Sequence, residues 1–277
     1  MASLQLILPS RPASTFRPRR RLIQCTADRQ ALFSRIAPVY DNLNDLLSLG
    51  QHRIWKRMAV SWSGAKEGDN VLDVCCGSGD LAFLLSEKVG PYGKVVGLDF
   101  SKEQLLIASS RQNLRSKNCY KNIKWIEGNA LDLPFADSYF DAVTIGYGLR
   151  NVPDVNKTMA EIHRVLKPGS KVSVLDFNKS VNPLATSIQE WMIDNVVVPV
   201  ASGYGLADEY KYLKTSIKDF LTGRELEKVG LETGFSTAKH YEIGLGLMGC
   251  LVSDGGLVAA CAIVLCCRFG DPYERGV

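Results

Sequence analysis

The sequence lacks the long apolar run that a membrane-spanning helix requires. No stretch reaches the roughly 18 apolar residues needed to cross a bilayer, and Asp254 interrupts the most apolar stretch near the C-terminus. Histidine is scarce, with three residues among 277, and the eight cysteines form no CxxC pair. We therefore expect no metal site and no disulfide framework, and small buried thiols instead.

Acidic residues are absent from the first 27 residues. Five arginines lie there instead: Arg11, Arg17, Arg19, Arg20 and Arg21. Subtracting these five from the net charge of +4 leaves −1 for the remainder, so no basic groove and no nucleic-acid partner is expected. The Ser-, Pro- and Arg-rich composition predicts a transit peptide over residues 1–27, and it favours a chloroplast over a mitochondrion. A basic tail that stays on the mature protein is the alternative.

Short β-branched segments alternate with helical patterns from residue 70 onward, which predicts an α/β fold with a doubly wound, mostly parallel sheet. The expected strands are Asn70 to Val74, Lys94 to Leu98, Ile123 to Glu127, Phe140 to Ile145, Lys171 to Asp176 and Thr237 to Glu242. Helices are expected near 80–88, 101–116, 155–166 and 222–230, with two or three short ones within 29–63. The segment 181–220 is too long for an ordinary connection and predicts a helical lid over the carboxyl edge of the sheet.

A glycine loop follows the first expected strand. The loop reads Cys75-Cys76-Gly77-Ser78-Gly79-Asp80, and such a loop lets the backbone approach a ligand closely at a helix N-terminus. The third glycine of the dinucleotide fingerprint is missing, because Ala82 stands in its place. Asp99 ends the next strand, where a carboxylate can accept both ribose hydroxyls of an adenosine.

A third motif lies after strand three. Glu127-Gly128-Asn129-Ala130 is followed by Leu133-Pro134-Phe135 and by Phe140-Asp141. With the glycine loop and Asp99, this set resembles the class I S-adenosylmethionine-dependent methyltransferases. The resemblance implies a Rossmann-like fold with S-adenosyl-L-methionine as cofactor. The cofactor-binding residues that it implies are Asp73, Gly77, Ser78, Gly79, Asp99, Phe100, Asn129 and Ala130.

Further segments resemble the signatures of the ubiquinone/menaquinone C-methyltransferase family. They are Tyr40-Asp41-Asn42-Leu43-Asn44 with Leu47-Ser48, His52 and Trp55; Gly148-Leu149-Arg150-Asn151-Val152; Arg164-Val165-Leu166-Lys167-Pro168-Gly169; and Tyr210-Lys211-Tyr212-Leu213 with Ser216-Ile217. The resemblance covers about residues 29–248. Ser170, Asp176 and Asn178 depart from the family pattern, which puts fine substrate choice in doubt more than the reaction. We expect a methyltransferase domain at 28–252, followed by an atypical tail at 253–277 that is either the product of a splice or gene-model variant or an added amphiphilic segment.

The resemblance, together with the leader, implies methylation of a ring carbon in a reduced prenylated naphthoquinone, demethylphylloquinol to phylloquinol. Another prenylated quinol, or a nicotinamide-dependent reductase, is the alternative. It also implies that Arg150, Asn151 and Tyr40 lie near the acceptor, where Arg150 could hold a water or a developing oxyanion. The alternative for Arg150 is that it ties its loop to a carboxylate. We further expect a plastid location and peripheral contact with a membrane that holds the lipid substrate. The sequence leaves the oligomeric state open between a monomer and a homodimer.

Overall fold

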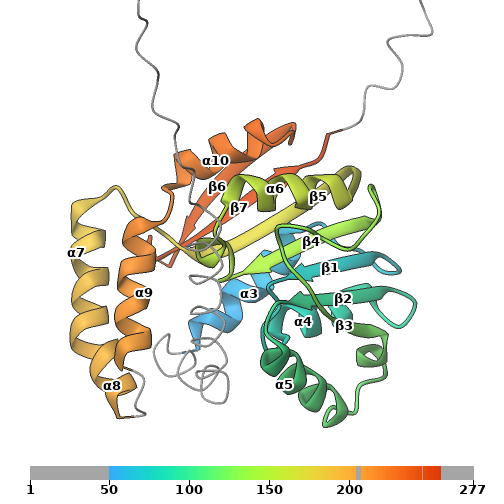
Figure 1. The fold of residues 1–277 in the computed structure, drawn as a ribbon, viewed down its shortest axis with the longest axis horizontal. Coiled ribbons are helices and arrows are strands. Elements are labelled where there is room, and N and C mark those ends of the chain that lie inside the picture. The colour runs from blue at the N-terminus through green and yellow to red at the C-terminus, as the bar shows by residue number, and fades with distance from the viewer. Residues whose placement is uncertain (1–49, 204–206, 245, 257–277) are drawn as a thin grey trace, which may run out of the picture.

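The computed structural model describes residues 50–203, 207–244 and 246–256. One sheet of seven strands runs through this part of the chain in the order β3-β2-β1-β4-β5-β7-β6 (Figure 1). The strands are β1 (Asn70–Val74), β2 (Lys94–Asp99), β3 (Ile123–Glu127), β4 (Phe140–Gly146), β5 (Leu166–Phe177), β6 (Thr237–Ile243) and β7 (Met248–Asp254). The pairs that join β3, β2, β1, β4 and β5 are parallel, and β7 is antiparallel to both β5 and β6.

Helices cover both faces of the sheet, which explains why most residues of the central strands are apolar and buried. On one face α3 (Gln51–Trp62) packs against α4 (Asp80–Val89), and α5 (Lys102–Asn113) follows β2. On the other face α6 (Val155–Val165) contacts α10 (Gly223–Glu232). Two separate apolar clusters, one centred on Phe83 and the other on Phe140, fill these two interfaces.

The ends of the helices follow local sequence signals. Ser101 and Asp154 cap α5 and α6 by accepting a hydrogen bond from a backbone amide in the first turn. Thr222 and Glu225 form a reciprocal capping box at the start of α10. These caps satisfy amides that the first turn of a helix leaves without an intrahelical partner.

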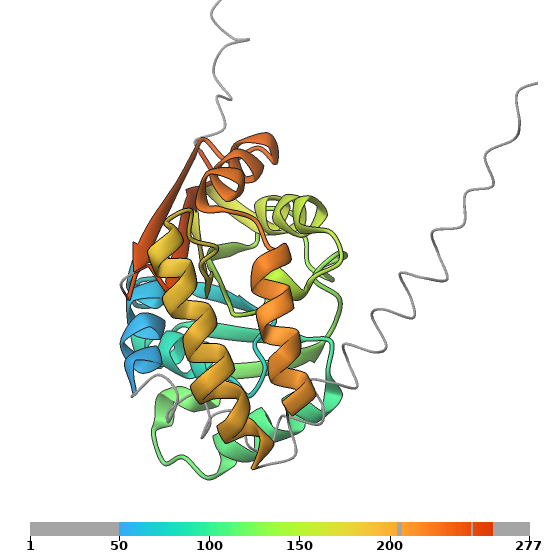
Figure 2. The same cartoon turned by 90° about the vertical axis from the view of Figure 1, so that its left-hand side faces the viewer.

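Helices α7 (Pro183–Met192), η3 (Ile193–Val197), α8 (Val198–Ser202) and α9 (Ala207–Asp219) connect β5 to α10. Figure 2 shows α7 and α9 side by side in front of the sheet. The η3 segment is a single π-helical stretch that continues α7. Helix α9 contacts η2 (Leu149–Asn151), the short turn that follows β4, and therefore lies next to the carboxyl edge of the sheet.

The start of β5 and the conformation of residues 167–169 differ from the sequence-based expectations. Strand β5 begins at Leu166 rather than at Lys171, because Leu166 already pairs with Phe140. Residues 167–169, where a turn was expected, form a bulge within β5. The pairing with β4 resumes with Lys171 opposite Ala142, and Gly169 in the bulge has a φ of 75°. The short helices expected before residue 50 lie outside the described residues.

Candidate active site

A cavity of about 610 Å³ opens at the carboxyl ends of the parallel strands. This is the edge where open α/β sheets bind their ligands, and the volume lies within the usual range of small-molecule sites. The residues that line it follow β1, β2, β3 and β4 or come from α3, α4 and α5. They include Lys56, Asp73, Cys75, Cys76, Gly77, Ser78, Asp80, Asp99, Phe100, Gln104, Asn129, Ala130, Tyr147 and Asn151.

The glycine loop between β1 and α4 forms one wall of this cavity. Its backbone takes positive φ values at Cys75 (55°), Gly77 (52°) and Gly79 (91°). A Cβ atom at Gly79 would lie 2.5 Å from the ring of Trp125, so only glycine fits there. On the opposite side of the loop, a Cβ atom at Gly148 would lie 2.4 Å from Cβ of Cys75. The loops after β1 and β4 therefore approach each other as closely as the backbone allows.

Asp99 joins the end of β2 to the glycine loop. Its Oδ2 accepts a hydrogen bond from the amide of Gly77 (2.8 Å), and its Oδ1 accepts one from the amide of Ser101 (2.9 Å). Burial raises the pKa of this carboxyl above its ordinary value, although the hydrogen bonds from backbone amides oppose the rise. The carboxylate lines the cavity at the position from which it can accept hydroxyl groups of a ribose.

Asp73 lies deeper, at the end of β1. Its Oδ1 accepts a hydrogen bond from the hydroxyl of Thr144 in β4 (2.8 Å). Burial raises its pKa to about 7, against the effect of hydrogen bonds from Thr144 and the Ala82 amide, and the charges of Asp99 and Asp80 add to the rise. The two strand-end carboxyls thus have different environments within one cavity.

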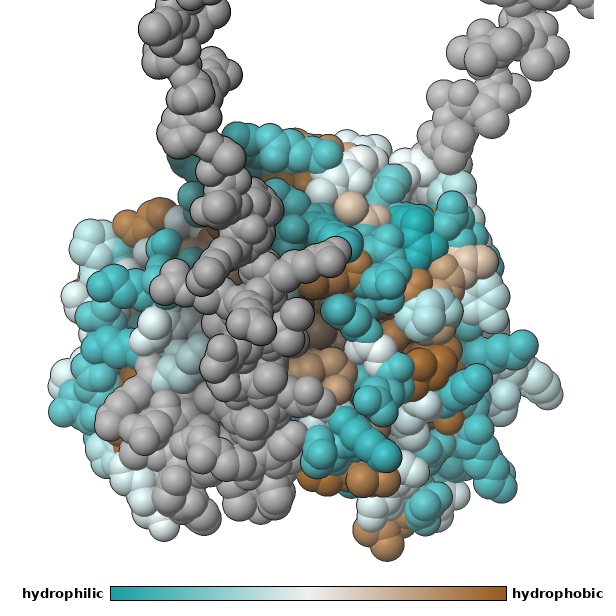
Figure 3. All heavy atoms as spheres, in the orientation of Figure 1, coloured by the Kyte–Doolittle hydropathy of each residue, from teal (hydrophilic) through white to brown (hydrophobic). Residues whose placement is uncertain are grey.

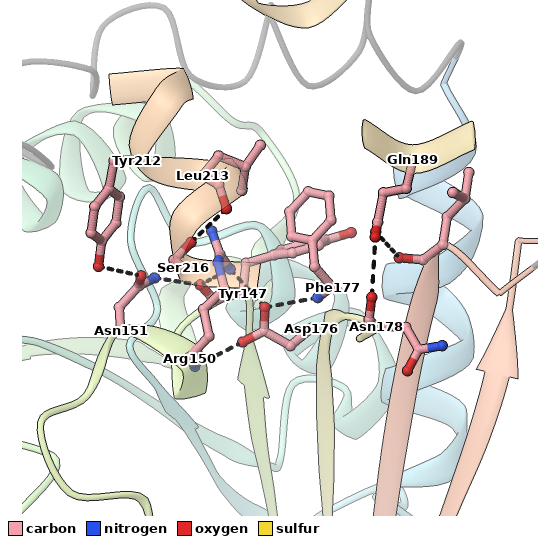
Figure 4. Close-up of polar contacts among 11 residues, drawn as sticks. Tyr147, Arg150, Asn151, Asp176, Phe177, Asn178, Gln189, Tyr212, Leu213 and Ser216 are labelled. Carbon is pink, nitrogen blue, oxygen red and sulfur yellow. Dashed lines mark hydrogen bonds and ion pairs between the residues drawn. The ribbon is translucent and has the colours of Figure 1, made fainter. Parts of the chain in front are cut away.

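Arg150 lies behind the cavity wall and is not among the residues that line it. Its guanidinium donates to Oδ1 of Asp176 (2.6 Å) and to the carbonyl of Tyr147 (2.7 Å), and its backbone amide donates to Oδ2 of Asp176 (3.1 Å). The side chains of this pair are only 5% and 4% exposed. Figure 4 shows the two pointing toward each other. This geometry favours the expected alternative, in which Arg150 ties its loop to a carboxylate.

Asn151 lines the cavity and connects it to α9. Its Nδ2 donates to the carbonyl of Tyr147 (3.1 Å), and its Oδ1 accepts a hydrogen bond from the hydroxyl of Tyr212 (3.2 Å; Figure 4). Tyr147 itself has a φ of 59°, an unusual conformation for a residue other than glycine. Two contacts therefore hold the turn after β4. Arg150 bonds to Asp176 of β5, and Asn151 bonds to Tyr212 of α9.

The structure brings most of the expected site residues together. Asp73, Gly77, Ser78, Asp99, Phe100, Asn129, Ala130 and Asn151 all line the cavity. Gly79 lies in the same loop without being part of the lining, and Tyr40 lies outside the described residues. Three further residues line the cavity although none was expected there: Lys56, Gln104 and Tyr147. Tyr147 stands directly before one quoted signature and Lys56 directly after Trp55 of another, whereas nothing local marks Gln104.

The residues present suit S-adenosylmethionine. The cavity offers a glycine loop at a helix N-terminus, a buried carboxylate for a ribose at Asp99, and the Asn129-Ala130 segment beside the same wall. The charged groups of the cavity lining are several acidic side chains and one ammonium group, that of Lys56. A zwitterionic amino acid joined to a nucleoside matches this combination in both charge and polarity. Across residues 50–203, 207–244 and 246–256, no group of His, Cys, Asp and Glu side chains is arranged to hold a metal.

The sheet order, the glycine loop and the cavity together define the class I S-adenosylmethionine-dependent methyltransferase fold. A solved S-adenosylmethionine-dependent methyltransferase from Aquifex aeolicus shares this fold, with a TM-score of 0.55 over 77% of this chain and 97% of that one, at 19% identity. Within this class, the chain belongs to the ubiE/COQ5 methyltransferase family, whose profile matches residues 24–253.

Two curated relatives are much more similar in sequence. The 2-phytyl-1,4-beta-naphthoquinone methyltransferase of Arabidopsis thaliana, a chloroplastic protein, is 67% identical over 242 residues, covering 87% of this chain and 93% of its own. The 2-phytyl-1,4-naphtoquinone methyltransferase of Synechocystis is 52% identical over 225 residues, covering 81% of this chain and 94% of its own. The family resemblance expected from the sequence is confirmed.

Proposed function

We propose that this protein transfers a methyl group from S-adenosylmethionine to a ring carbon of a reduced prenylated naphthoquinone, converting demethylphylloquinol to phylloquinol. The observation that carries the proposal is the 67% identity over 242 residues to a phytyl-naphthoquinone methyltransferase. The cavity at the carboxyl edge of the sheet supports it, because its lining suits the cofactor of this family. The protein is accordingly a C-methyltransferase of a prenylated quinol.

Asp99 and the glycine loop hold the cofactor in this proposal. Asp99 accepts the ribose hydroxyls, and Gly77, Ser78 and Gly79 let the backbone of the loop approach the ligand. Asn129 and Ala130 lie beside the adenine end, and Phe100 follows Asp99 along the same wall. The bound cofactor supplies an electrophilic methyl group on a sulfonium. Asp73 also lines the cavity, and its hydrogen bond from Thr144 joins the end of β1 to β4.

The acceptor must be the quinol, since the ring carbon of an oxidised quinone is electron-poor. A phenol titrates near pH 10, so the site has to stabilise the phenolate oxygen that pushes electron density onto the ring. Asn151 lines the cavity and is the proposed polar contact for that oxygen. Arg150 holds the turn that presents Asn151, and Tyr40 stays a proposed acceptor contact. Alignment of carbon, methyl and sulfur supplies much of the remaining acceleration.

The redox state of the acceptor tests this proposal. We expect purified protein with S-adenosylmethionine to methylate demethylphylloquinol, kept reduced by excess dithionite, and to leave demethylphylloquinone untouched. The phenolate oxygen exists only in the reduced form, so only that form has a nucleophilic ring carbon. Mass spectrometry of the extracted lipids reads both reactions in parallel. Equal turnover of the oxidised form under strictly oxidising conditions would disprove the proposed mechanism.

The location of the protein follows from the same proposal. The Arabidopsis relative is chloroplastic, and residues 1–27 have a transit-peptide composition, so we propose a plastid location in the stroma or at a plastid membrane. None of the helices in the described ranges is long and apolar enough to span a membrane. A phytyl substrate nevertheless resides in lipid, so peripheral contact with a lipid surface forms part of the proposal.

Helix α7 is the surface that suits such contact. Its exposed residues Leu184, Ile188 and Trp191 recur at helical spacing on one face, and Val181 and Val196 extend the same apolar surface. Among the described residues, 5 of the 12 exposed large hydrophobic side chains fall within this one segment. The part of the face in Figure 3 that grey atoms leave visible is mostly polar, with separate apolar patches. A lipid surface would remove the α7 side chains from water.

A further inference from the structure

Lys56 is a buried ammonium group in the wall of the cofactor cavity. It lies on the inner face of α3, and the residue is only 6% exposed. Its Nζ donates to Oδ2 of Asp80 (2.5 Å) and lies 5.8 Å from the centre of the Tyr147 ring. An ammonium group has three donors, and burial of such a charge is costly unless partners compensate it. A lysine in this position therefore calls for a purpose beyond the packing of α3.

Asp80 does not by itself account for Lys56, because a second cation shares the same carboxylate. Arg111 on α5 donates to Oδ1 of Asp80 (2.6 Å) and also to the carbonyl and hydroxyl of Ser78. Burial raises the pKa of Asp80, but the attraction of Lys56 and Arg111 outweighs burial and holds the pKa below its ordinary value. Two cations therefore share one carboxylate beside the glycine loop.

Of these two cations only Lys56 lines the cavity, and the other charged residues of the lining are acidic. The lining includes Asp73, Asp80, Asp99 and Glu127, and Lys56 is the one lysine or arginine among the described residues that line it. S-adenosylmethionine has a single anionic group, the carboxylate of its methionine portion, together with an ammonium and a sulfonium. Placing the carboxylate elsewhere on this lining would set it against like charges, at an energetic cost.

We propose that Lys56 binds the carboxylate of the methionine portion of S-adenosylmethionine, and that Asp80, held by Arg111, positions the ammonium group for it. The N-terminal turn of α4 lies beside Lys56 through Asp80 and adds a favourable dipole. The proposal rests on the use of this cofactor but not on the identity of the quinol. It makes α3, a helix that precedes the sheet, part of the cofactor site.

The test compares two ligands that differ only in that carboxylate. Calorimetry would measure the affinity of the full-length protein for S-adenosylmethionine and for decarboxylated S-adenosylmethionine. We expect the wild type to prefer the carboxylated ligand at least tenfold, since charge-assisted hydrogen bonds are worth about that factor or more. Lys56→Met should weaken S-adenosylmethionine at least tenfold and the decarboxylated ligand less than threefold, which removes the preference.

Two control variants separate this role from a structural one. Arg111→Met removes the other cation on Asp80 but no donor from the cavity lining, so both affinities should change by the same factor and the preference should remain. Should Lys56→Met fold poorly, Lys56→Met combined with Asp80→Asn removes both charges of the pair, and the preference should again be lost.

The outcomes are distinguishable. If Lys56→Met weakens both ligands equally, or neither, Lys56 does not bind the carboxylate and the inference is overturned while the proposed function stands. A wild type that shows no preference between the ligands overturns it as well. Failure of the wild type to bind either ligand would overturn the inference together with the proposed use of this cofactor.

Discussion

Single residues in this protein take their roles from burial more than from type. Asp73 and Asp99 both lie at the carboxyl ends of parallel strands, yet Asp73 bonds to a hydroxyl of β4 and Asp99 to backbone amides after β1 and β2. Arg150 and Lys56 are both buried cations, but one faces a carboxylate behind the wall and the other lines the cavity. The neighbours of each charged group therefore determine how much that group changes the free energy of unfolding. Substitution of the group measures this change.

Asp73 should make stability depend on pH. Its carboxyl has a pKa near 7 in the folded protein and an ordinary value when unfolded, so the folded state holds a proton that the unfolded chain loses. Stability therefore falls as the pH rises from about 4 to about 7, and the loss is complete above that range. Asp73→Asn cannot ionise and keeps an acceptor for Thr144.

We expect Asp73→Asn to increase the free energy of unfolding at pH 8.5 by up to about 4 kcal/mol, and by markedly less at pH 5. Urea denaturation at the two pH values measures both differences. Asp219→Asn, at an exposed carboxyl at the end of α9, is the control and should show no such dependence. An Asp73→Asn effect that is the same at both pH values would contradict the assigned cause.

Arg150 should contribute mainly to stability. Arg150→Met would leave Asp176 buried without its cation, and loss of one partner from a buried pair costs about 3–5 kcal/mol. The exposed pair of Lys228 and Glu232 provides the control, because Lys228→Met should cost less than about 1 kcal/mol. Thermal and urea denaturation measure both variants. An unchanged melting temperature with a single-turnover rate about 100-fold lower would instead show that Arg150 acts on the reacting groups.

At the scale of elements, the helices between β5 and α10 combine two surfaces. Helix α9 faces inward and contacts the turn after β4 through Tyr212 and Asn151. Helix α7 presents Leu184, Ile188 and Trp191 outward, whereas Gln189 on its inner side donates to the carbonyl of Leu247 (3.3 Å). We propose that this helical segment is a lid, with one surface for the acceptor and the other for the lipid phase that contains it.

The outward face of α7 predicts binding to lipid vesicles. We expect the wild type to float with phosphatidylcholine vesicles, and the triple variant Leu184→Glu, Ile188→Glu and Trp191→Glu to lose at least a hundredfold in partition coefficient. Each of these side chains contributes roughly 1.5–3 kcal/mol when it leaves water. Leu106→Glu with Leu114→Glu changes exposed leucines of α5 and its end as the control. Vesicle binding by the triple variant equal to wild type would remove α7 from the proposal.

At the scale of the whole molecule, the leader should act independently of the enzyme that it precedes. We expect a fluorescent fusion of the complete chain to enter plastids of leaf cells, and a fusion lacking residues 2–27 to stay in the cytosol. The five arginines of the leader lie within the first 27 residues, which contain no acidic residue, so the shortened fusion lacks the whole transit-peptide composition. Plastid import of the shortened fusion would contradict the assignment.

Local signals in the sequence predicted most helices and strands of the sheet, together with the glycine loop and Asp99 of the site. The glycine loop needs only a strand before it and a helix after it, and Asp99 needs only to end the next strand, so both follow from neighbours along the chain. The parallel order of the central strands then brings these segments to one edge. The family resemblance, rather than local structure, implied Asp73, Ser78, Asn129 and Asn151, and the cavity includes all four.

Tertiary structure alone decided the partners of the buried charges. Arg150 meets Asp176 across 26 residues and Lys56 meets Asp80 across 24, and neither distance along the chain has a periodicity that reveals a contact. The first pairing depends on β5 lying beside β4, and the second on α3 packing against α4. The sequence around β7 likewise does not predict its position between β5 and β6. That position depends on the unpaired edge that β5 offers in the folded sheet. Local patterns specify which groups end strands, whereas the packing of distant elements specifies which charges they neutralise.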